Sequence, residues 1–304
     1  GMLDTSIAQR EYSYNEIVNF LFSLQEKYNF VKVVPIGKTI LGRTIYAVKI
    51  GMVDYTVLYA AGFHASERLT TLSMLIFLER FADSLQNNTN FSISSARNAL
   101  FGKSVFVVPV VNPDGYEIAR AGAATAGNQA NRILEIANGT DLKYWNANAR
   151  GIDINHNFNA GFDLMKQIER NDGIFGPSPR RYGGEAPESE PETQALLKLV
   201  RDNYIAQVIA WHSQGEEIYW QYGDSTPEKS YLLAQLFGTA SGYAVADPAP
   251  NASHAGFKDW FIEDFGRPGF TIEIGKGMNP LPATMLHEIY GGLEELILIS
   301  IALA

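Results

Sequence analysis

The chain has 304 residues, of which 46% are hydrophobic, and this is enough for one large α/β domain, which we prefer to two small ones. Its 33 acidic and 24 basic residues give a net charge of −9, which disfavours nucleic acids and anionic membranes as partners. Cysteine is absent, so disulfides, a cysteine nucleophile and thiolate metal sites are excluded, and a metal would need His, Asp and Glu ligands.

The residues that follow Met2 have neither the basic n-region nor the apolar h-region of a secretory signal peptide. Gly1 looks like a remnant of a tag ahead of the native Met2, and we interpret residues 1–12 as an N-terminal extension of a single domain covering 1–304. No stretch approaches the roughly 20 apolar residues of a membrane span. We therefore expect no membrane span, and a cytoplasmic protein if Met2 is the true start.

The first third of the chain predicts a helix, a hairpin, a strand and a second helix. Residues 13–28 begin with a possible capping serine and place apolar residues on one stripe, which is typical of an amphipathic helix. The two apolar runs 31–36 and 44–50 predict a hairpin. Residues 57–61 form an apolar run typical of a buried strand, and 69–84 have apolar residues at helical spacing.

The rest of the chain alternates between buried strands and helices. Residues 104–111 predict a strand covered on both faces, and the segment Asn112 to Gly115 has the composition of a turn. We interpret 119–148 as a long surface excursion that lines a site, and 176–188 as a second long loop. Strands are then predicted at 205–212 and 269–274, and helices at 189–203, 231–243, 256–265 and 286–303.

A histidine and a glutamate stand three positions apart where the strand 57–61 turns into the following helix. His64 and Glu67 therefore lie at the carboxyl end of a strand, where α/β sheets usually carry their chemistry. An imidazole and a carboxylate suit Zn²⁺, but a catalytic site needs a third protein ligand. Alone, the pair is equally compatible with a helix-start carboxylate beside a chance histidine.

Two further strands end in residues of the same kind. His212 closes the predicted strand 205–212, and Glu273 interrupts the apolar strand 269–274. Burying a carboxylate without a partner would cost several kcal/mol. Glu273 therefore either meets a cation that stabilises the fold or lines a cleft and transfers protons, and we favour the second interpretation.

The ordered motifs of the chain resemble those of the zinc metallocarboxypeptidases. The resemblance runs from about Ser13 to the C-terminus and is carried by Phe63–Glu67, Val111–Tyr116, Gly151–Phe158, Trp211–Ser213 and Thr271–Glu273. Within the family, four segments resemble a bacterial branch that cleaves γ-D-glutamyl bonds to diamino acids in cell-wall peptides: Trp145–Gly151, Ser189–Thr193, His212–Glu216 and Gly256–Phe261.

This resemblance implies a fold and a set of roles. The fold is a single α/β domain with a mixed, mostly parallel central sheet flanked by helices. His64, Glu67 and His212 would bind a single Zn²⁺, and Glu273 would act as the general base on the attacking water. Arg150 is the candidate cation for the oxyanion, although the family's arginine can also be aligned directly after the tryptophan, where this chain has Asn146.

The chain also departs from the family pattern. Ser66 and His156 stand where the family commonly has arginine, and an imidazole cannot reproduce a bidentate guanidinium contact to a carboxylate. Candidate substrate contacts are Asn155, His156, Ser66, His254 and Glu216. The pair Arg180 and Arg181 is interpreted as a solvated loop pair that could also meet a carboxylate near the cleft.

We expect a zinc peptidase that acts on short peptides, most specifically on the γ-D-glutamyl to diaminopimelate bond of murein peptides. The alternative enzyme is a conventional carboxypeptidase with altered recognition of the terminal carboxylate. A zinc-containing peptide-binding protein without turnover is the alternative from another class, and the presence of Glu273 argues against it. The sequence has no feature that fixes the oligomeric state.

Overall fold

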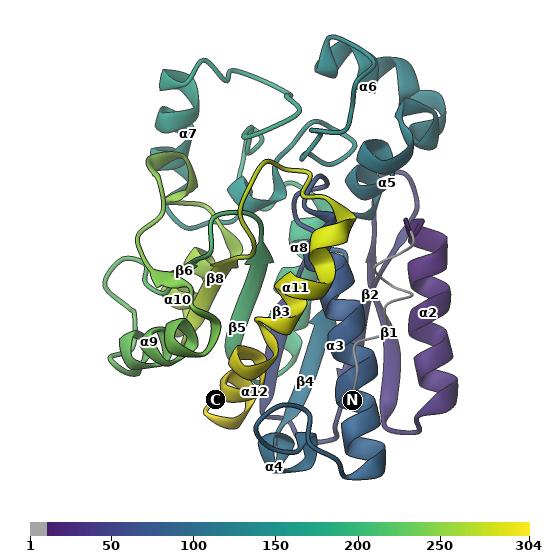
Figure 1. Ribbon diagram of the computed structural model, residues 1–304. Coiled ribbons are helices and arrows are strands. Elements are labelled where there is room, and N and C mark those ends of the chain that lie inside the picture. The colour runs from purple at the N-terminus through teal and green to yellow at the C-terminus, as the bar shows by residue number, and fades with distance from the viewer. Residues whose placement is uncertain (1–10) are drawn as a thin grey trace.

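A single mixed β-sheet runs through the centre of the molecule (Figure 1), as seen in a computed structural model that describes residues 11–304. Within these residues, eight strands pair in the order β1-β2-β4-β3-β5-β8-β6-β7. Their bounds are β1 (Val31–Lys38), β2 (Thr44–Ile50), β3 (Thr56–Ala60), β4 (Ser104–Val108), β5 (Ile205–His212), β6 (Glu217–Tyr219), β7 (Ala244–Val245) and β8 (Gly269–Glu273).

The four central strands β4, β3, β5 and β8 are parallel to one another, and the antiparallel pairings lie toward the edges. The carboxyl ends of the parallel strands therefore meet at one edge of the sheet. This edge is at the top of Figure 1, where the loops and helices α5, α6 and α7 gather. The expected α/β fold with a mixed, mostly parallel sheet is confirmed.

Helices cover both faces of the sheet. Helices α3, α11 and α12 lie in front of it in Figure 1, and α8 lies behind it. The helical bounds are α2 (Tyr14–Lys27), α3 (Arg68–Asn87), α4 (Ala96–Leu100), α5 (Pro113–Ala121), α6 (Ala130–Ala137), α7 (Phe162–Asn171), α8 (Pro191–Asp202), α9 (Lys229–Ser241), α10 (Phe257–Phe265), α11 (Leu286–Gly291) and α12 (Glu294–Ala302).

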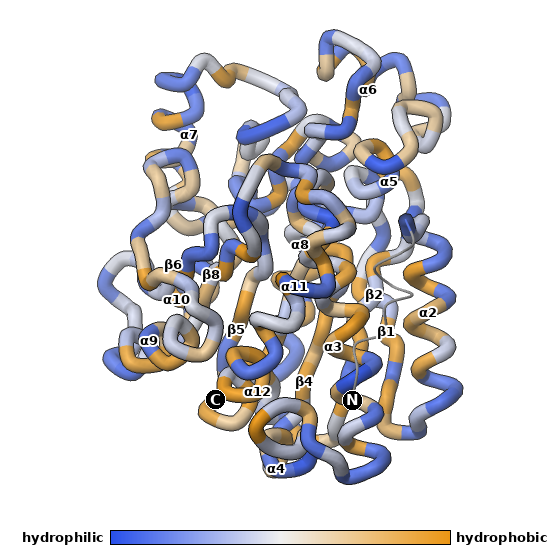
Figure 2. The backbone as a smooth tube through the Cα atoms, viewed as in Figure 1, coloured by the Kyte–Doolittle hydropathy of each residue, from blue (hydrophilic) through white to orange (hydrophobic). Residues whose placement is uncertain are grey.

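The alternation of side chains along the strands divides the core into two layers. Tyr59 and Trp211 point to the layer that contains α2, α3, α9, α11 and α12, whereas Leu58 and Ala210 point to the layer with α8 and α10. Because both faces are buried, the central strands are continuously hydrophobic, as the orange tube of β4 and β5 shows in Figure 2.

Local signals in the sequence set several element boundaries. Ser13 caps α2 in a capping box, in which its hydroxyl accepts from the backbone N–H of Glu16 and its own N–H donates to the Glu16 carboxylate. The expected helices and strands at 13–28, 31–36, 44–50, 57–61, 69–84, 205–212 and 269–274 are present with small shifts of their ends.

Other expectations were wrong. The segment Asn112 to Gly115 is not a simple turn: Asn112 is the N-cap of α5, and its side chain accepts from the N–H of Gly115. The excursion 119–148 contains the helix α6, and the single helix expected at 286–303 is divided into α11 and α12 after Gly291. Helices α4 and α7 and strand β6 were not among the elements expected from the sequence.

The expected N-terminal extension, residues 1–12, lies mostly outside the described residues. Within its last part, Tyr12 is buried and its carbonyl accepts a hydrogen bond from the hydroxyl of Tyr116. Tyr12 therefore belongs to the packed body and not to an extension. In the region described, no helix combines the length and apolar character that a bilayer crossing requires.

Candidate metal centre and catalytic cleft

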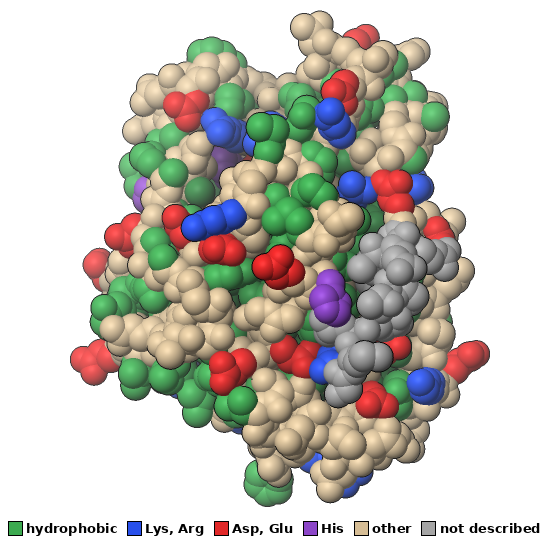
Figure 3. Space-filling view, viewed as in Figure 1, with side chains coloured by type: hydrophobic (Ala, Val, Ile, Leu, Met, Phe, Trp, Pro, Cys, Tyr) green, Lys and Arg blue, Asp and Glu red, His purple; other side chains and the backbone are tan. Residues whose placement is uncertain are grey.

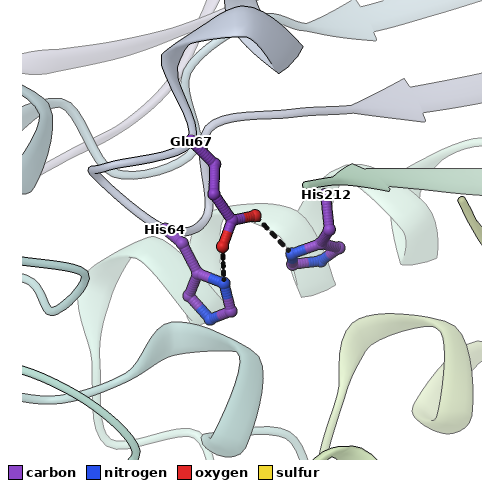
Figure 4. A group of neighbouring side chains, drawn as sticks. All are labelled: His64, Glu67 and His212. Carbon is purple, nitrogen blue, oxygen red and sulfur yellow. Dashed lines mark hydrogen bonds and ion pairs between the residues drawn. The ribbon is translucent and has the colours of Figure 1, made fainter. Parts of the chain in front are cut away.

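His64, Glu67 and His212 meet at the carboxyl edge of the sheet (Figure 4). The Nδ1 atom of His64 lies 2.8 Å from one carboxylate oxygen of Glu67, and the Nδ1 atom of His212 lies 3.3 Å from the other. One ligand atom from each residue lies within 4.8 Å of the other two. Two nitrogens and a carboxylate are a donor set that Zn²⁺ prefers.

The backbone brings these side chains together from two strands and a helix start. His212 is the last residue of β5, and Glu67 immediately precedes α3. The turn between β3 and His64 depends on Gly62, which has φ 68° and whose Cβ would lie 2.9 Å from the Thr71 hydroxyl. The N–H of Ser213 donates to Glu67 and fixes the carboxylate between the two imidazoles.

Asp153 holds the other side of the His64 ring. Its carboxylate lies 2.8 Å from Nε2 of His64, and because a carboxylate only accepts, Nε2 carries the proton. An unprotonated Nδ1 would then face the Glu67 oxygen, so that two acceptors would oppose each other. A positive charge therefore belongs at this point, as a second ring proton or as a bound cation.

The electrostatics of the group also favour a cation. Burial alone would raise the pKa of Glu67, but His64 and His212 lower it to about 2. Burial alone would lower the pKa of His64, but Asp153 and Glu67 raise it well above its usual value. Nε2 of His212 is buried with no hydrogen-bond partner among the described residues. The residues present therefore fit a zinc ion.

Glu273 faces the same group from the neighbouring strand. It ends β8 directly opposite His212 in the parallel register, so both side chains project on the same face of the sheet. Burial, and then the Glu67 carboxylate, raise the pKa of Glu273 well above its usual range. A carboxylate that holds a proton readily is suited to accept one from water and pass it on.

A cleft of about 290 Å³ opens in front of these residues. It is lined by His64, Glu67, His212 and Glu273, and by Asn155 and His156 among the residues expected to contact substrate. Ser66 lies in an adjoining pocket of about 430 Å³, which shares Arg180, Gln214 and Asn279 with the cleft. The structure therefore brings the expected ligands, the expected base and two expected substrate contacts into one cleft.

Three other expected site residues do not line this cleft. The guanidinium of Arg150 is half exposed and pairs with Glu190 at 3.4 Å. The Nδ1 atom of His254 hydrogen-bonds the hydroxyl of Tyr222, and Glu216 pairs with Lys276 at 3.7 Å. Their expected roles at the oxyanion and at the substrate are not supported by these positions.

Two expected substrate contacts are already engaged within the protein. Ser66 is buried and donates its hydroxyl to the Asn146 side-chain oxygen. Both ring nitrogens of His156 lie 2.9 Å from backbone carbonyl oxygens, those of Arg181 and Asn251. Carbonyls only accept, so both nitrogens donate and the ring is an imidazolium that ties two segments of the cleft wall together.

The electrostatic surroundings of His156 agree with this protonation state. Burial alone would lower the pKa of His156, but the carboxylates of Asp153 and Glu169 raise it above its usual value. The expected role of His156 as a substrate contact is thus replaced by a role in the wall, although its ring still borders the cleft.

Several residues of the cleft were not among the expected site residues, although Arg180 and Arg181 were interpreted as a loop pair that could also meet a carboxylate near the cleft. Asp153 lies in the segment Gly151–Phe158, one of the segments that carry the family resemblance. Its position in this segment was the signal that could have identified it. Asn146, Arg180 and Arg181 also line the cleft. Asn146 was noted only because it follows a tryptophan, and the two arginines carry no spacing signal because they lie in a loop.

The partner of Arg150 belongs to a buried acidic pair. The side chain of Asn148 donates to both Glu190 and Glu192, which lie at the start of α8. Glu192 is fully buried, and this burial raises its pKa to about 8. Glu192 is therefore protonated in the folded protein at neutral pH.

Glu192 makes the stability of the protein depend on pH. Between about 4.5, where an unfolded glutamate titrates, and about 8, the folded state binds more protons than the unfolded state, so the free energy of unfolding falls as pH rises. The free energy of unfolding falls by about 1.4 kcal/mol per pH unit, a few kcal/mol in all. Glu192→Gln keeps the acceptor oxygen but does not titrate, so we expect this variant to lack the fall. Urea unfolding of both proteins at pH 5, 7 and 9 measures it, and parallel stability profiles would contradict the assignment.

The comparisons with known proteins agree with this geometry. A family model described as zinc carboxypeptidase matches residues 17–291. The chain is 37% identical over 284 residues to gamma-D-glutamyl-L-diamino acid endopeptidase 1 of Lysinibacillus sphaericus, which covers 93% of this chain and 70% of the relative. It is 26% identical over 257 residues to carboxypeptidase B of Rattus norvegicus, which covers 79% of this chain and 57% of that protein.

Solved structures show the same fold. The crystal structure of thrombin activatable fibrinolysis inhibitor has a TM-score of 0.77 at 20% identity and covers 98% of this chain and 75% of that chain. Murein-tripeptide amidase MpaA from Escherichia coli O157 has a TM-score of 0.52 at 19% identity and covers 89% of each chain. With the family match over most of its length, the chain belongs to the zinc carboxypeptidase family and is a zinc peptidase.

Proposed function

We propose that this protein hydrolyses the amide bond between γ-D-glutamate and diaminopimelate in murein peptides. The observation that carries the proposal is the 37% identity to the L. sphaericus endopeptidase over 93% of this chain. The same relative supports a bacterial source. The cytoplasmic location remains a prediction from the sequence.

Five residues of the cleft have a place in this reaction. His64, Glu67 and His212 would hold one zinc ion, which when bound supplies a Lewis acid that polarises the scissile carbonyl and lowers the pKa of water to about 7. Asp153 orients His64. Glu273 takes a proton from the attacking water and transfers it to the leaving nitrogen.

A conventional carboxypeptidase is the second candidate, favoured by the similarity to carboxypeptidase B. Such an enzyme needs a cation for the terminal carboxylate of its substrate, and His156 is engaged by two backbone carbonyls instead. The non-catalytic peptide-binding alternative is disfavoured by Glu273, because a binding protein has no use for a raised-pKa carboxylate beside the metal ligands.

The test is product analysis with zinc-loaded protein. The tripeptide L-Ala-γ-D-Glu-meso-diaminopimelate should be cleaved to L-Ala-D-Glu and diaminopimelate, and acylated dipeptides of ordinary L-amino acids should be cleaved slowly or not at all. Preferential release of a C-terminal L-amino acid from the ordinary peptides would support the carboxypeptidase instead. Tight binding of the tripeptide in calorimetry without any product would support the binding protein.

A further inference from the structure

Two arginines border the cleft, and neither has an acidic partner among the described residues. Lys and Arg side chains, blue in Figure 3, lie among the loops at the upper edge of the molecule. Among the described residues that line the cleft, Arg180 and Arg181 are the only arginine or lysine side chains. Both are exposed, and within residues 11–304 neither guanidinium lies within ion-pair distance of a carboxylate. A carboxylate partner would neutralise the charge of an arginine. Without such a partner, the guanidinium groups of Arg180 and Arg181 are available to bind a ligand.

The backbone that carries the two arginines is fixed on both sides. The carbonyl of Pro179 accepts from the N–H groups of Asn146 and Ala147, each at 3.0 Å. The carbonyl of Tyr182 accepts from the N–H of Asp153, the residue that orients His64. The loop is thus attached directly to the segments that build the metal centre, and the arginines have a defined position relative to it.

Arg181 itself has a constrained conformation. Its φ of 70° lies in the left-handed region, which a residue with a side chain adopts at a cost of about 1–2 kcal/mol. Its carbonyl receives the hydrogen bond from the His156 imidazolium at 2.9 Å. The buried histidine therefore holds Arg181 in this conformation at the rim.

The rest of the cleft offers an anion little positive charge besides a bound metal. Glu67, Asp153 and Glu273 are carboxyl groups. Of the positions where an arginine was expected from the family pattern, Ser66 and Asn146 are neutral and bonded to each other, and His156 is bonded to two carbonyls. Arg180 also lines the adjoining pocket, so its charge reaches a ligand that extends from one pocket to the other.

We propose that Arg180 and Arg181 bind a carboxylate of the peptide substrate next to the scissile bond and so restrict the enzyme to acidic peptides. The proposal rests on the proposed function, because the γ-linked tripeptide carries the free α-carboxylate of D-glutamate on one side of that bond and the carboxylates of diaminopimelate on the other. A guanidinium binds a carboxylate through two parallel hydrogen bonds, which gives both affinity and orientation.

The experiment compares three probes: the free tripeptide, the tripeptide with an amide in place of the D-glutamate α-carboxylate, and the tripeptide with an amide in place of the diaminopimelate α-carboxylate. The zinc-loaded wild type is compared with Arg180→Gln, Arg181→Gln and the double variant, and Arg180→Lys and Arg181→Lys keep the charge. Arg170→Gln removes an exposed arginine of α7 that does not line the cleft, and it is the matched control.

We expect the double variant to lose about 10- to 100-fold in kcat/KM for the free tripeptide, mainly through KM. The wild type should cleave only one of the two amidated probes poorly, and the carboxylate missing from that probe is the one that the arginines bind. The double variant should cleave this probe and the free tripeptide with similar kcat/KM. The lysine variants should retain part of the preference. If the double variant keeps the wild-type preference for the free acid, the proposal is overturned.

A binding measurement separates this proposal from the proposed function. Calorimetry of the three probes is repeated with zinc-loaded Glu273→Gln protein, with and without the arginine substitutions. In one outcome, the wild type cleaves no probe while the protein with both arginines still binds the free acid more tightly than the amide. That result would overturn the proposed function and support the arginine site. If Glu273→Gln protein with both arginines intact binds all three probes with equal affinity, the arginine site alone is overturned.

Discussion

Replacing Glu273 by glutamine should lower kcat for the murein tripeptide by about 10²- to 10⁴-fold, the usual contribution of a general acid–base group. Glutamine has the same shape but cannot accept a proton from water or return it to the leaving nitrogen. Glu273 makes no side-chain hydrogen bond to the described residues, so the change to glutamine breaks none. Steady-state kinetics of zinc-loaded protein measure the effect.

The control for this variant is its metal content and ligand affinity. Zinc stoichiometry and the dissociation constant of the tripeptide should stay near the wild-type values, because Glu273 is not one of the three grouped metal ligands. A variant that retains more than a tenth of wild-type kcat would exclude Glu273 as the base.

Substitution of His212 by alanine should have the second large effect, the loss of stable zinc binding and with it of hydrolysis. A ligand pair of His64 and Glu67 leaves only two protein donors, fewer than a catalytic zinc site needs. Zinc at 100 times its dissociation constant stabilises a protein by about 2.7 kcal/mol. We expect zinc to raise the Tm of the wild type and to leave that of His212→Ala unchanged.

Two further variants calibrate this result. Asp153→Asn should weaken zinc affinity by about 10- to 100-fold, since it disturbs the orientation of His64 without removing a ligand. His287→Ala removes an exposed histidine of α11 and should behave as the wild type in a competition titration with a chelator. Undiminished zinc affinity in His212→Ala would contradict the proposed ligand set.

The sequence predicted the centre of the molecule well. Strands β3, β5 and β8 are covered on both faces, so each is a continuous apolar run with one reactive residue at or just beyond its end. Parallel strands place their carboxyl ends at one edge, and this geometry brings His64, His212 and Glu273 together although they are far apart in the chain.

The rim of the cleft was much harder to predict. The roles expected for Arg150 and His156 depended on how loops fold over the edge of the sheet. An ion pair with Glu190 places Arg150, and a hydrogen bond to the carbonyl of Arg181 places His156. Loops have no periodicity, so neither contact has a signature in the sequence. For Arg180 and Arg181 the sequence left open a solvated loop pair or a contact to a carboxylate near the cleft, and the structure places both side chains at the cleft.

The attachment of the 179–182 loop has a consequence for how new specificities arise in this scaffold. The metal centre is built on strand ends inside the sheet, whereas the charged rim belongs to one surface segment joined to it mainly by main-chain hydrogen bonds, which are indifferent to side-chain identity. Side chains on this segment are therefore free to diverge while the hydrolytic apparatus stays intact. A library confined to positions 180 and 181 would be the smallest change that retargets the enzyme to another class of peptide.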